Sequence, residues 1–285
     1  MSKSIKILHP GIYSTIQDNG RQGYAFYAIP RSGIMDNQSY NNIKSVLNTD
    51  DNISVIECTL QSPTILFNDT MQIATSGANM QWKINKQPLT LNTLVTVHKG
   101  DILKGGYATS GYRGYIGFSK QMEVSRHFDS VSSYSYASLG ANNGQPLIKE
   151  QVITFKAENS ITNRQLTRDI LSSTNTIHIN KGPEYSWMDS SSQEILTGEI
   201  FRISAQSNRM GARLDGPPIT TTQLLSQSVP VLPGFIQLLP SGQLIVLLQD
   251  GQTTGGYPRI GYLSDKELVT LNQVPIGKSV RFMSD

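Results

Sequence analysis

The sequence predicts a mainly β protein with a few short helices. Short runs of β-type residues recur along the 285-residue chain and are separated by Gly, Pro, Asn or Ser. Uncharged polar residues are abundant, with 32 Ser, 22 Thr and 20 Gln against 16% charged residues, which suits the solvent faces of sheets. Few stretches show the apolar spacing of a helix. Many short strands with frequent turns are typical of sandwiches and barrels.

Ten short runs are predicted to form strands, because each is bounded by turn residues and has the length of a typical strand. In chain order they are 5–8, 72–75, 94–97, 114–118, 152–155, 176–179, 200–203, 235–238, 244–248 and 280–283.

The strongest helix signal begins at Asp36, which is a good N-cap residue. Tyr40, Ile43, Val46 and Leu47 follow at helical spacing and form one apolar face. We therefore expect the longest or nearly the longest helix of the protein between Asp36 and Leu47.

Shorter helices are predicted later in the chain. Residues 190–196 are followed by Gly198, a favourable residue just after a helix end. Ser264 and Glu267 form a capping box at the start of another helix. Residues 164–171 form a weaker candidate.

The chain is predicted to divide near residue 165. Strand patterning lapses between residues 157 and 175, where the segment is polar and has no apolar run of strand length. We expect an N-terminal β subdomain over 1–165 and a C-terminal one over 166–285.

Charge and composition exclude several functions. The net charge is +3 and no block of five like charges occurs, so we expect neither nucleic acid nor a membrane surface as a partner. The apolar run 244–248 is too short to span a bilayer and the N-terminus lacks an apolar signal region, which favours a cytoplasmic protein. Cys58 and four scattered histidines have no zinc-like spacing, so no metal site is expected.

Three blocks concentrate residues that could carry chemistry. The first spans residues 10–36, where glycines allow a tightly bent path and polar side chains supply donors and acceptors. Its candidate substrate-binding residues are Gln17, Asp18, Arg21, Tyr24, Ser32 and Asp36. Alternatively this block is a structural loop in which Asp18 and Arg21 pair locally and Asp36 caps a helix.

The second block, residues 207–216, places Arg209 and Arg213 four residues apart around a glycine. Guanidinium groups fork onto carboxylate or phosphate, so the pair suits a planar anion. Alternatively these arginines hold Asp215 or cap backbone carbonyls.

The third block, residues 247–263, is a polar loop that leaves the most apolar predicted strand. Such loops often form binding sites, because the strand fixes their position and glycine lets a ligand approach the backbone. The candidates are Asp250, Gln252, Thr253, Thr254, Gly255, Tyr257 and Arg259. Alternatively the loop is a hairpin that turns at Gly255 and Gly256.

Other motifs are absent from the sequence. No GxxxxGK[ST] phosphate loop occurs, so the chain has no Walker-type nucleotide site. No GxSxG motif occurs either, and no Ser-His-Asp set can be argued from the sequence.

In this order, the three blocks resemble the KipA-like family, also called allophanate hydrolase subunit 2. The strongest matches are STIQDNGRQGY with PRSGIMD, then SNRMGARLDG, then DGQTTGGYPRIG, and the resemblance runs from about Ile5 to Phe282. Shorter matches include Ile56-Glu57, Gly182-Pro183 and PGFIQ at 233–237. The chain departs from the family pattern at 119–122, around 130–136, and at Asn208, where an aspartate is usual.

The resemblance implies two β-barrel-like subdomains, the C-terminal one cyclophilin-like. It also implies a C-type subunit of an ATP-dependent 5-oxoprolinase, which converts 5-oxo-L-proline to L-glutamate and is inactive alone. The implied partners are a KipI-like B-type subunit, and a separate A-type subunit of the lactam-hydrolase kind. The substrate would be a small amide or lactam, and ATP would be bound within the complex.

We assign catalytic roles to Arg209, Asp250 and Gln252, and substrate binding to the other candidates of the first and third blocks. Two alternatives stay open. One is the carboxyltransferase half of a urea-carboxylase-like enzyme that uses biotin. The other is a regulatory protein that binds a KipI-like kinase inhibitor.

Overall fold

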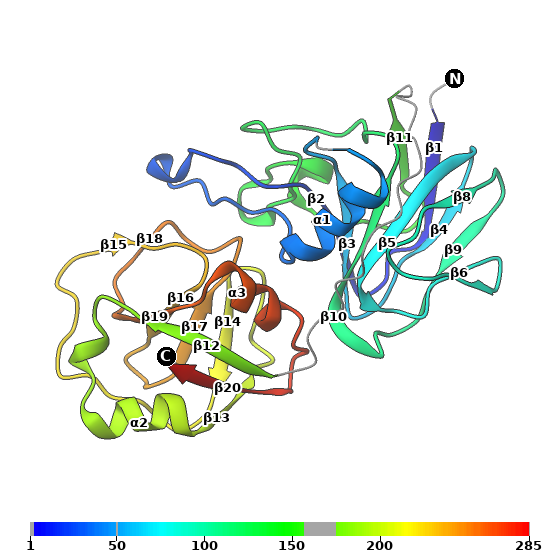
Figure 1. The fold of residues 1–285 in the computed structure, drawn as a ribbon. Coiled ribbons are helices and arrows are strands. Elements are labelled where there is room, and N and C mark those ends of the chain that lie inside the picture. The colour runs from blue at the N-terminus through cyan, green and yellow to red at the C-terminus, as the bar shows by residue number, and fades with distance from the viewer. Residues whose placement is uncertain (1–2, 50, 157–174, 285) are drawn as a thin grey trace. The chain divides into compact units, whose positions relative to one another are not determined.

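The computed structural model describes residues 3–49, 51–156 and 175–284, which form two units (Figure 1). The first unit holds residues 3–21 and 32–156, and the second holds residues 22–31 and 175–284. The predicted boundary at 165 and the predicted helix at 164–171 lie outside the described residues.

The first unit contains two antiparallel sheets. The six-stranded sheet has the order β11-β1-β4-β9-β6-β7, with β1 (Lys3–His9), β4 (Thr64–Phe67), β6 (Lys83–Ile84), β7 (Gln87–Pro88), β9 (Ile102–Lys104) and β11 (Val152–Phe155). The five-stranded sheet has the order β2-β3-β10-β5-β8, with β2 (Tyr13–Gln17), β3 (Val55–Thr59), β5 (Met71–Asn79), β8 (Val95–Val97) and β10 (Ser110–Phe118). Ile7 and Phe67 of the first sheet and Ile56 and Ile116 of the second belong to one buried cluster, so the sheets share a core.

Helix α1 (Asn37–Val46) covers the other face of the five-stranded sheet. Asp36 starts it, since its Oδ1 accepts a hydrogen bond from the Ser39 amide at 2.9 Å. A Cβ added to Gly117 of β10 would lie 2.1 Å from Cγ2 of Ile43. The helix can therefore approach the sheet only because residue 117 has no side chain.

The second unit is a closed barrel of seven strands in the order β12-β19-β16-β17-β14-β13-β20. Its strands are β12 (Thr176–Lys181), β13 (Ile200–Ile203), β14 (Gly211–Asp215), β16 (Phe235–Leu238), β17 (Leu244–Leu247), β19 (Arg259–Tyr262) and β20 (Ser279–Ser284). The strands β12 and β20 are parallel and close the barrel, whereas the other neighbours are antiparallel. Two short strands, β15 (Val229–Pro230) and β18 (Thr254–Gly255), form a separate pair.

Two helices of the second unit begin where the sequence predicts. The other residues that were predicted to mark a helix end do not act as predicted. Helix α2 (Ser190–Gly198) keeps Gly198 as its last helical residue, so the prediction that Gly198 follows the helix end is wrong. Helix α3 (Asp265–Asn272) is capped by Ser264 Oγ, which accepts from the Glu267 amide at 3.4 Å. The Glu267 carboxylate accepts from the amide of His178 at 3.1 Å, so the capping box is only half formed.

Four single-turn 3-10 helices complete the described elements: η1 (Ala25–Tyr27), η2 (Ser135–Ala137), η3 (Ala141–Gly144) and η4 (Tyr185–Trp187). All ten predicted strands and the three capped helices are present, which confirms the mainly β class. Within the described part of the chain, no helix has the length and apolar character needed to cross a membrane. The likeness of the second barrel to cyclophilin stays a prediction.

Candidate functional site

In the first unit, the carboxylate of Asp18 is fully buried and holds a serine-rich segment in place. Its Oδ1 accepts from the hydroxyls of Ser130 and Ser132 at 2.5 and 2.6 Å, and from the amide of Gly20 at 3.0 Å. Its Oδ2 accepts from the amide of Val131 at 3.0 Å. Hydrogen bonds to a charged acceptor are short and strong. Asp18 is therefore an anchor for residues 130–132, where the chain departs from the family pattern.

Three other candidates of the first block, Gln17, Arg21 and Ser32, are also buried. Arg21 donates through Nη2 to the carbonyl of Ser132 at 2.5 Å. Gln17 donates through Nε2 to Thr15 Oγ1 at 2.9 Å, while its Oε1 has no hydrogen-bond partner among the described residues. The same holds for the hydroxyl of Ser32, whose φ of 54° is left-handed. Buried polar atoms are normally hydrogen-bonded, so Gln17 and Ser32 have capacity for a water molecule or a ligand.

Asp36 connects α1 to a second buried carboxylate. The hydroxyl of Tyr115 accepts from the Asp36 amide at 2.9 Å and donates to Oε2 of Glu57 at 2.7 Å. The same oxygen of Glu57 accepts from the amide of Met35 at 2.8 Å. Burial, and then the charges of Glu57 and Asp36, raise the pKa of Tyr115 well above its usual value. Tyr115 therefore stays a hydrogen-bond donor, and the pair fixes the backbone at residues 35 and 36.

Strand pairing explains why these residues meet. Thr15, Glu57, Tyr115 and Ser76 lie directly opposite one another across four strands, and so share one face of the sheet. Ser76 is buried, and its hydroxyl has no partner within the described residues. Sequence reasoning did not assign Glu57, Tyr115 or Ser76 to the site, although Ile56-Glu57 and the TSGA stretch at 75–78 match the family pattern.

In the second unit, Arg209 and Asp250 form a buried ion pair. Arg209 donates through Nε to Oδ2 at 2.9 Å and through Nη2 to Oδ1 at 3.1 Å. The amide of Asp250 also donates to the carbonyl of Arg209 at 3.0 Å. Asn208 Oδ1 accepts from the amides of Met210 and Gly211, as an aspartate at this position could. Arg209 therefore binds Asp250, and not Asp215 as one reading of the sequence suggested.

Arg259 is held in a similar way by Glu184. It donates through Nε and Nη2 to the two Glu184 oxygens at 3.0 and 2.8 Å, and through Nη1 to the carbonyl of Pro230 at 3.0 Å. Burial opposes the ionisation of Glu184, but the hydrogen bonds from Arg259 outweigh it and lower the pKa of this carboxyl. The hydrogen bond to Glu184 in turn raises the pKa of Arg259. Glu184, which follows the matched Gly182-Pro183, was missed from the sequence.

The rest of the third block is a polar loop that includes β18. Gln252, Thr254 and Tyr257 are exposed, Thr253 is half-buried and Gly255 is buried. The structure pairs β18 with β15, in place of the alternative hairpin in which Gly255 and Gly256 would have formed the turn. The loop therefore presents amide and hydroxyl groups to solvent from a fixed backbone.

The predicted site residues fall in both units. The first unit holds Gln17, Asp18, Arg21, Ser32 and Asp36. The second holds Arg209, Asp250, Gln252, Thr253, Thr254, Gly255, Tyr257 and Arg259, together with Tyr24, which precedes η1. Their roles in binding and catalysis stay predictions. Across the described ranges, no group of three or more His, Cys, Asp or Glu residues could hold a metal ion.

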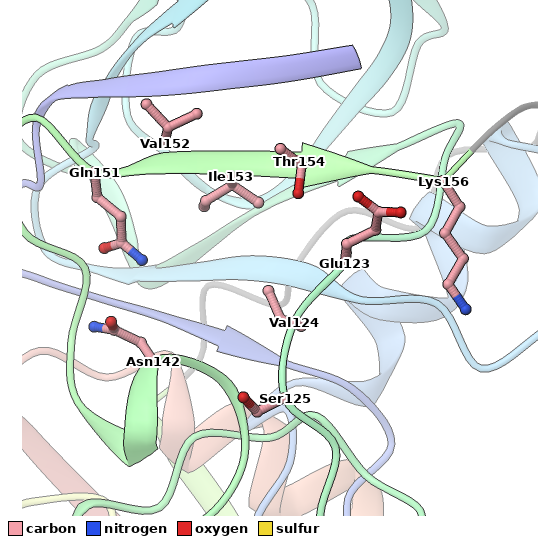
Figure 2. Close-up of a pocket in the computed structure, with 9 residues that line it drawn as sticks. All are labelled: Glu123, Val124, Ser125, Asn142, Gln151, Val152, Ile153, Thr154 and Lys156. Atoms are coloured by element: carbon pink, nitrogen blue, oxygen red, sulfur yellow. The ribbon is translucent and has the colours of Figure 1, made fainter. Parts of the chain in front are cut away.

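A hollow of about 540 Å³ lies elsewhere on the first unit (Figure 2). Residues 123–125, Asn142 and the edge of β11 line it, and Figure 2 shows the carboxylate of Glu123 near Thr154. The backbone amide of Glu123 donates to the carbonyl of Thr154 at 2.8 Å. None of the predicted site residues lines this hollow, so it is separate from the candidate site.

Comparisons of this chain with a family model and with known proteins agree with one another. Residues 27–284 match the model of the carboxyltransferase domain, subdomain A and B. The chain is 30% identical to the C subunit of 5-oxoprolinase from Escherichia coli (strain K12) over 284 residues, which cover 98% of this chain and 90% of that protein. It is 29% identical to the C subunit of 5-oxoprolinase from Haemophilus influenzae (strain ATCC 51907 / DSM 11121 / KW20 / Rd), with the same coverage of both chains.

Among solved structures, the urea amidolyase of K. lactis superimposes with a TM-score of 0.90 at 23% identity. The superposition covers 99% of this chain and 18% of the amidolyase, so this chain spans less than a fifth of that protein. At this identity the likeness concerns the fold.

Proposed function

Because the chain belongs to the carboxyltransferase domain, subdomain A and B family, we propose that it is the C-type subunit of an ATP-dependent 5-oxoprolinase. The complex would convert 5-oxo-L-proline to L-glutamate. The observation that carries this proposal is the pair of relatives that are C subunits of 5-oxoprolinase, each of which aligns over 98% of this chain and 90% of its own length. The chain is therefore the homologue of a whole subunit of that enzyme.

In this proposal residues 252–255 and Tyr257 of the polar loop bind the substrate. Its exposed amide and hydroxyl groups suit the neutral lactam group of the substrate, which has one carbonyl acceptor and one N–H donor. The carboxyl group of 5-oxoproline would be met by the backbone donors around Gly255. Asp250 and Arg209 would hold the start of the loop rigid, so that its donors are already oriented when the substrate arrives.

ATP does not fit the residues of this chain that were expected to bind anions. Arg209 and Arg259 both direct two of their nitrogens onto carboxylates, which leaves neither fork open for a phosphate. The sequence also lacks a phosphate loop. We therefore propose that the ATP site of the complex lies on a partner protein.

The proposed partners are a KipI-like B-type subunit and an A-type subunit of the lactam-hydrolase kind, and the proposed location is the cytoplasm. On its own the chain would be inactive, because it has neither a nucleotide loop nor a complete acid-base pair. Its contribution would be to bind and orient the lactam.

Reconstitution tests the proposal. The purified chain is mixed with its KipI-like and lactam-hydrolase-type partners, and ATP hydrolysis and glutamate are measured with and without 5-oxoproline. We expect 5-oxoproline to stimulate ATP hydrolysis, and glutamate to form only when all three proteins are present. Turnover by the single chain, or no stimulation by 5-oxoproline in the full mixture, would contradict the proposal.

The family description favours one second candidate, a carboxyltransferase half that moves a carboxyl group from carboxybiotin to urea. The same reconstitution separates the two candidates when a biotin carboxylase and urea replace the 5-oxoprolinase components. Carboxylation of urea without any response to 5-oxoproline would favour this reading.

A further inference from the structure

We propose that Gln237 is a substrate-contacting residue and that its carboxamide nitrogen donates to the carbonyl oxygen of a small amide or lactam. This inference rests on the proposed function and names a residue that the three blocks did not contain. Gln237 lies on β16 and is 1% exposed. Its Nε2 is buried and has no hydrogen-bond partner among the described residues.

Three predicted site residues surround this side chain. Arg259 of β19 pairs with Gln237 of β16, beside an irregularity in the strand register between Ile236 and Gln237. Gly255 lies against Gln237, and the exposed Gln252 lies next to both. The unpartnered nitrogen is therefore inside the candidate site of the second unit and not in an unrelated part of the core.

The space around Gly255 brings two donors together. A Cβ added to Gly255 would lie 2.6 Å from Nε2 of Gln237 and 2.9 Å from Nε2 of Gln252. Two NH₂ groups cannot satisfy each other, because each is a donor. The two nitrogens are close enough for one acceptor oxygen to bridge them, and a side chain at residue 255 would displace them.

The chemistry of the pair indicates the ligand. Two neutral donors that converge on one point suit a carbonyl oxygen, since a phosphate or a free carboxylate is normally bound by charged groups. The nearby Arg259 does not make the site favour an anion, because its guanidinium group is already paired with Glu184. A lactam, a primary amide or urea has the required oxygen.

A buried donor without an acceptor also lowers stability, and this gives the proposal a second, independent readout. Gln237→Met keeps the size of the side chain and removes the donor. We expect its melting temperature to equal or exceed that of the wild type. We expect the KM for 5-oxoproline in the reconstituted complex to rise about three- to tenfold, as for the loss of one neutral hydrogen bond, with a smaller change in kcat.

Two matched controls accompany the experiment. Gln249→Met makes the same change at a glutamine whose buried, unpartnered atom is Oε1, an acceptor that cannot bind a carbonyl oxygen. Gly255→Ala fills the space between the two nitrogens, whereas a Cβ at Gly256 meets nothing within 4 Å. We expect Gly255→Ala to weaken binding as Gln237→Met does, and Gly256→Ala and Gln249→Met to bind like the wild type.

Binding is also measured without activity, by following the side-chain ¹⁵N–H₂ signal of Gln237 while 2-pyrrolidone, acetamide or urea is added to the chain. The signal is assigned by its loss in Gln237→Met. A shift that Gly255→Ala abolishes supports the inference even if the complex does not act on 5-oxoproline. No shift with any of the three probes, or a lowered melting temperature of Gln237→Met with an unchanged KM, would overturn it.

Discussion

The guanidinium group of Arg209 lies against the carboxylate of Asp250, with two nitrogen–oxygen distances of 2.9 and 3.1 Å in a buried setting. The pair joins the segment before β14 to the loop after β17, and a backbone hydrogen bond between the same two residues runs beside it. Removing one partner leaves the other charge buried, which costs more than the pair contributes when intact.

We expect Asp250→Asn to lower the free energy of unfolding by about 3 to 5 kcal/mol, because Arg209 then keeps a buried charge without a counter-ion. Arg209→Lys keeps the charge but loses the two-point contact, so its cost should be smaller, about 1 to 3 kcal/mol. Urea unfolding of both variants measures this. Equal losses, or losses under about 0.5 kcal/mol, would contradict a buried pair.

The same Arg209→Lys variant separates a catalytic role from a structural one. If Arg209 contacts the reacting group, turnover per folded complex should fall roughly ten- to a hundredfold. The assay is run well below the melting temperature, so that lost stability does not appear as lost activity. Unchanged turnover with a depressed melting temperature would remove Arg209 from the catalytic residues.

Tyr115→Phe should loosen the backbone at Met35 and Asp36, because the Asp36 amide loses its acceptor and Glu57 loses a donor. Hydrogen exchange of these two amides should become faster, and stability should fall by about 1 to 3 kcal/mol. Tyr40→Phe is the matched control. Tyr40 is equally buried and donates to the carbonyl of Ile53 at 2.9 Å. Equal exchange of both amides in the two variants would show that the Tyr115 contact does not position this segment.

Gly117→Ala should destabilise the first unit, because the new Cβ would overlap Ile43 of α1. Forcing an extra methyl group into a packed core costs about 1 to 3 kcal/mol. Gly198→Ala serves as the control, since a Cβ there meets nothing within 4 Å. We expect it to be neutral or to stabilise α2 by up to ~1 kcal/mol. A neutral Gly117→Ala would mean that α1 can move away from the sheet without cost.

Asp189, the N-cap of α2, gives a prediction for acid pH. The Ser192 amide and then nearby hydroxyl groups lower the pKa of Asp189 from 3.8 to about 2. The pKa of Asp189 is lower in the folded protein than in the unfolded chain. The stability that the ionised Asp189 gives to the fold is therefore complete above the unfolded pKa and is lost as the pH falls from about 4 to 2. The melting temperatures of wild type and Asp189→Asn should therefore converge from pH 5 towards pH 2. Parallel curves over this range would contradict the assignment.

Strand and helix positions could be predicted because their signals are local. Asp36 and Ser264 cap helices through amides three residues ahead, and the strand runs are visible from their own composition. Gly198 shows the limit of such signals, since it is the last residue of the helix and does not follow the helix end. A favourable residue at a helix end does not require the left-handed conformation.

The contacts that build the candidate site were harder to predict, because they join distant parts of the chain. Tyr115 and Glu57 are 58 residues apart, and Arg259 and Glu184 are 75 residues apart. No local pattern states which strands will be neighbours, and the register decides which side chains share a face. The sequence therefore indicated Arg259 as a substrate-binding residue, but not that Glu184 takes two of its nitrogens.

The parallel pairing of β12 with β20 has a consequence for protein synthesis. Both neighbours of β12 in the barrel, β19 and β20, are among its last strands to be made. About 100 residues separate β12 from β20, and at ~5 to 20 residues per second a ribosome needs roughly 5 to 20 s to add them. During that interval β12 does not yet have both of its neighbouring strands, so its apolar side chains are not yet packed in a closed barrel. The unpaired edge of β12 is then open to chaperones and proteases, and a chain that ends before β20 lacks the strand that closes the barrel.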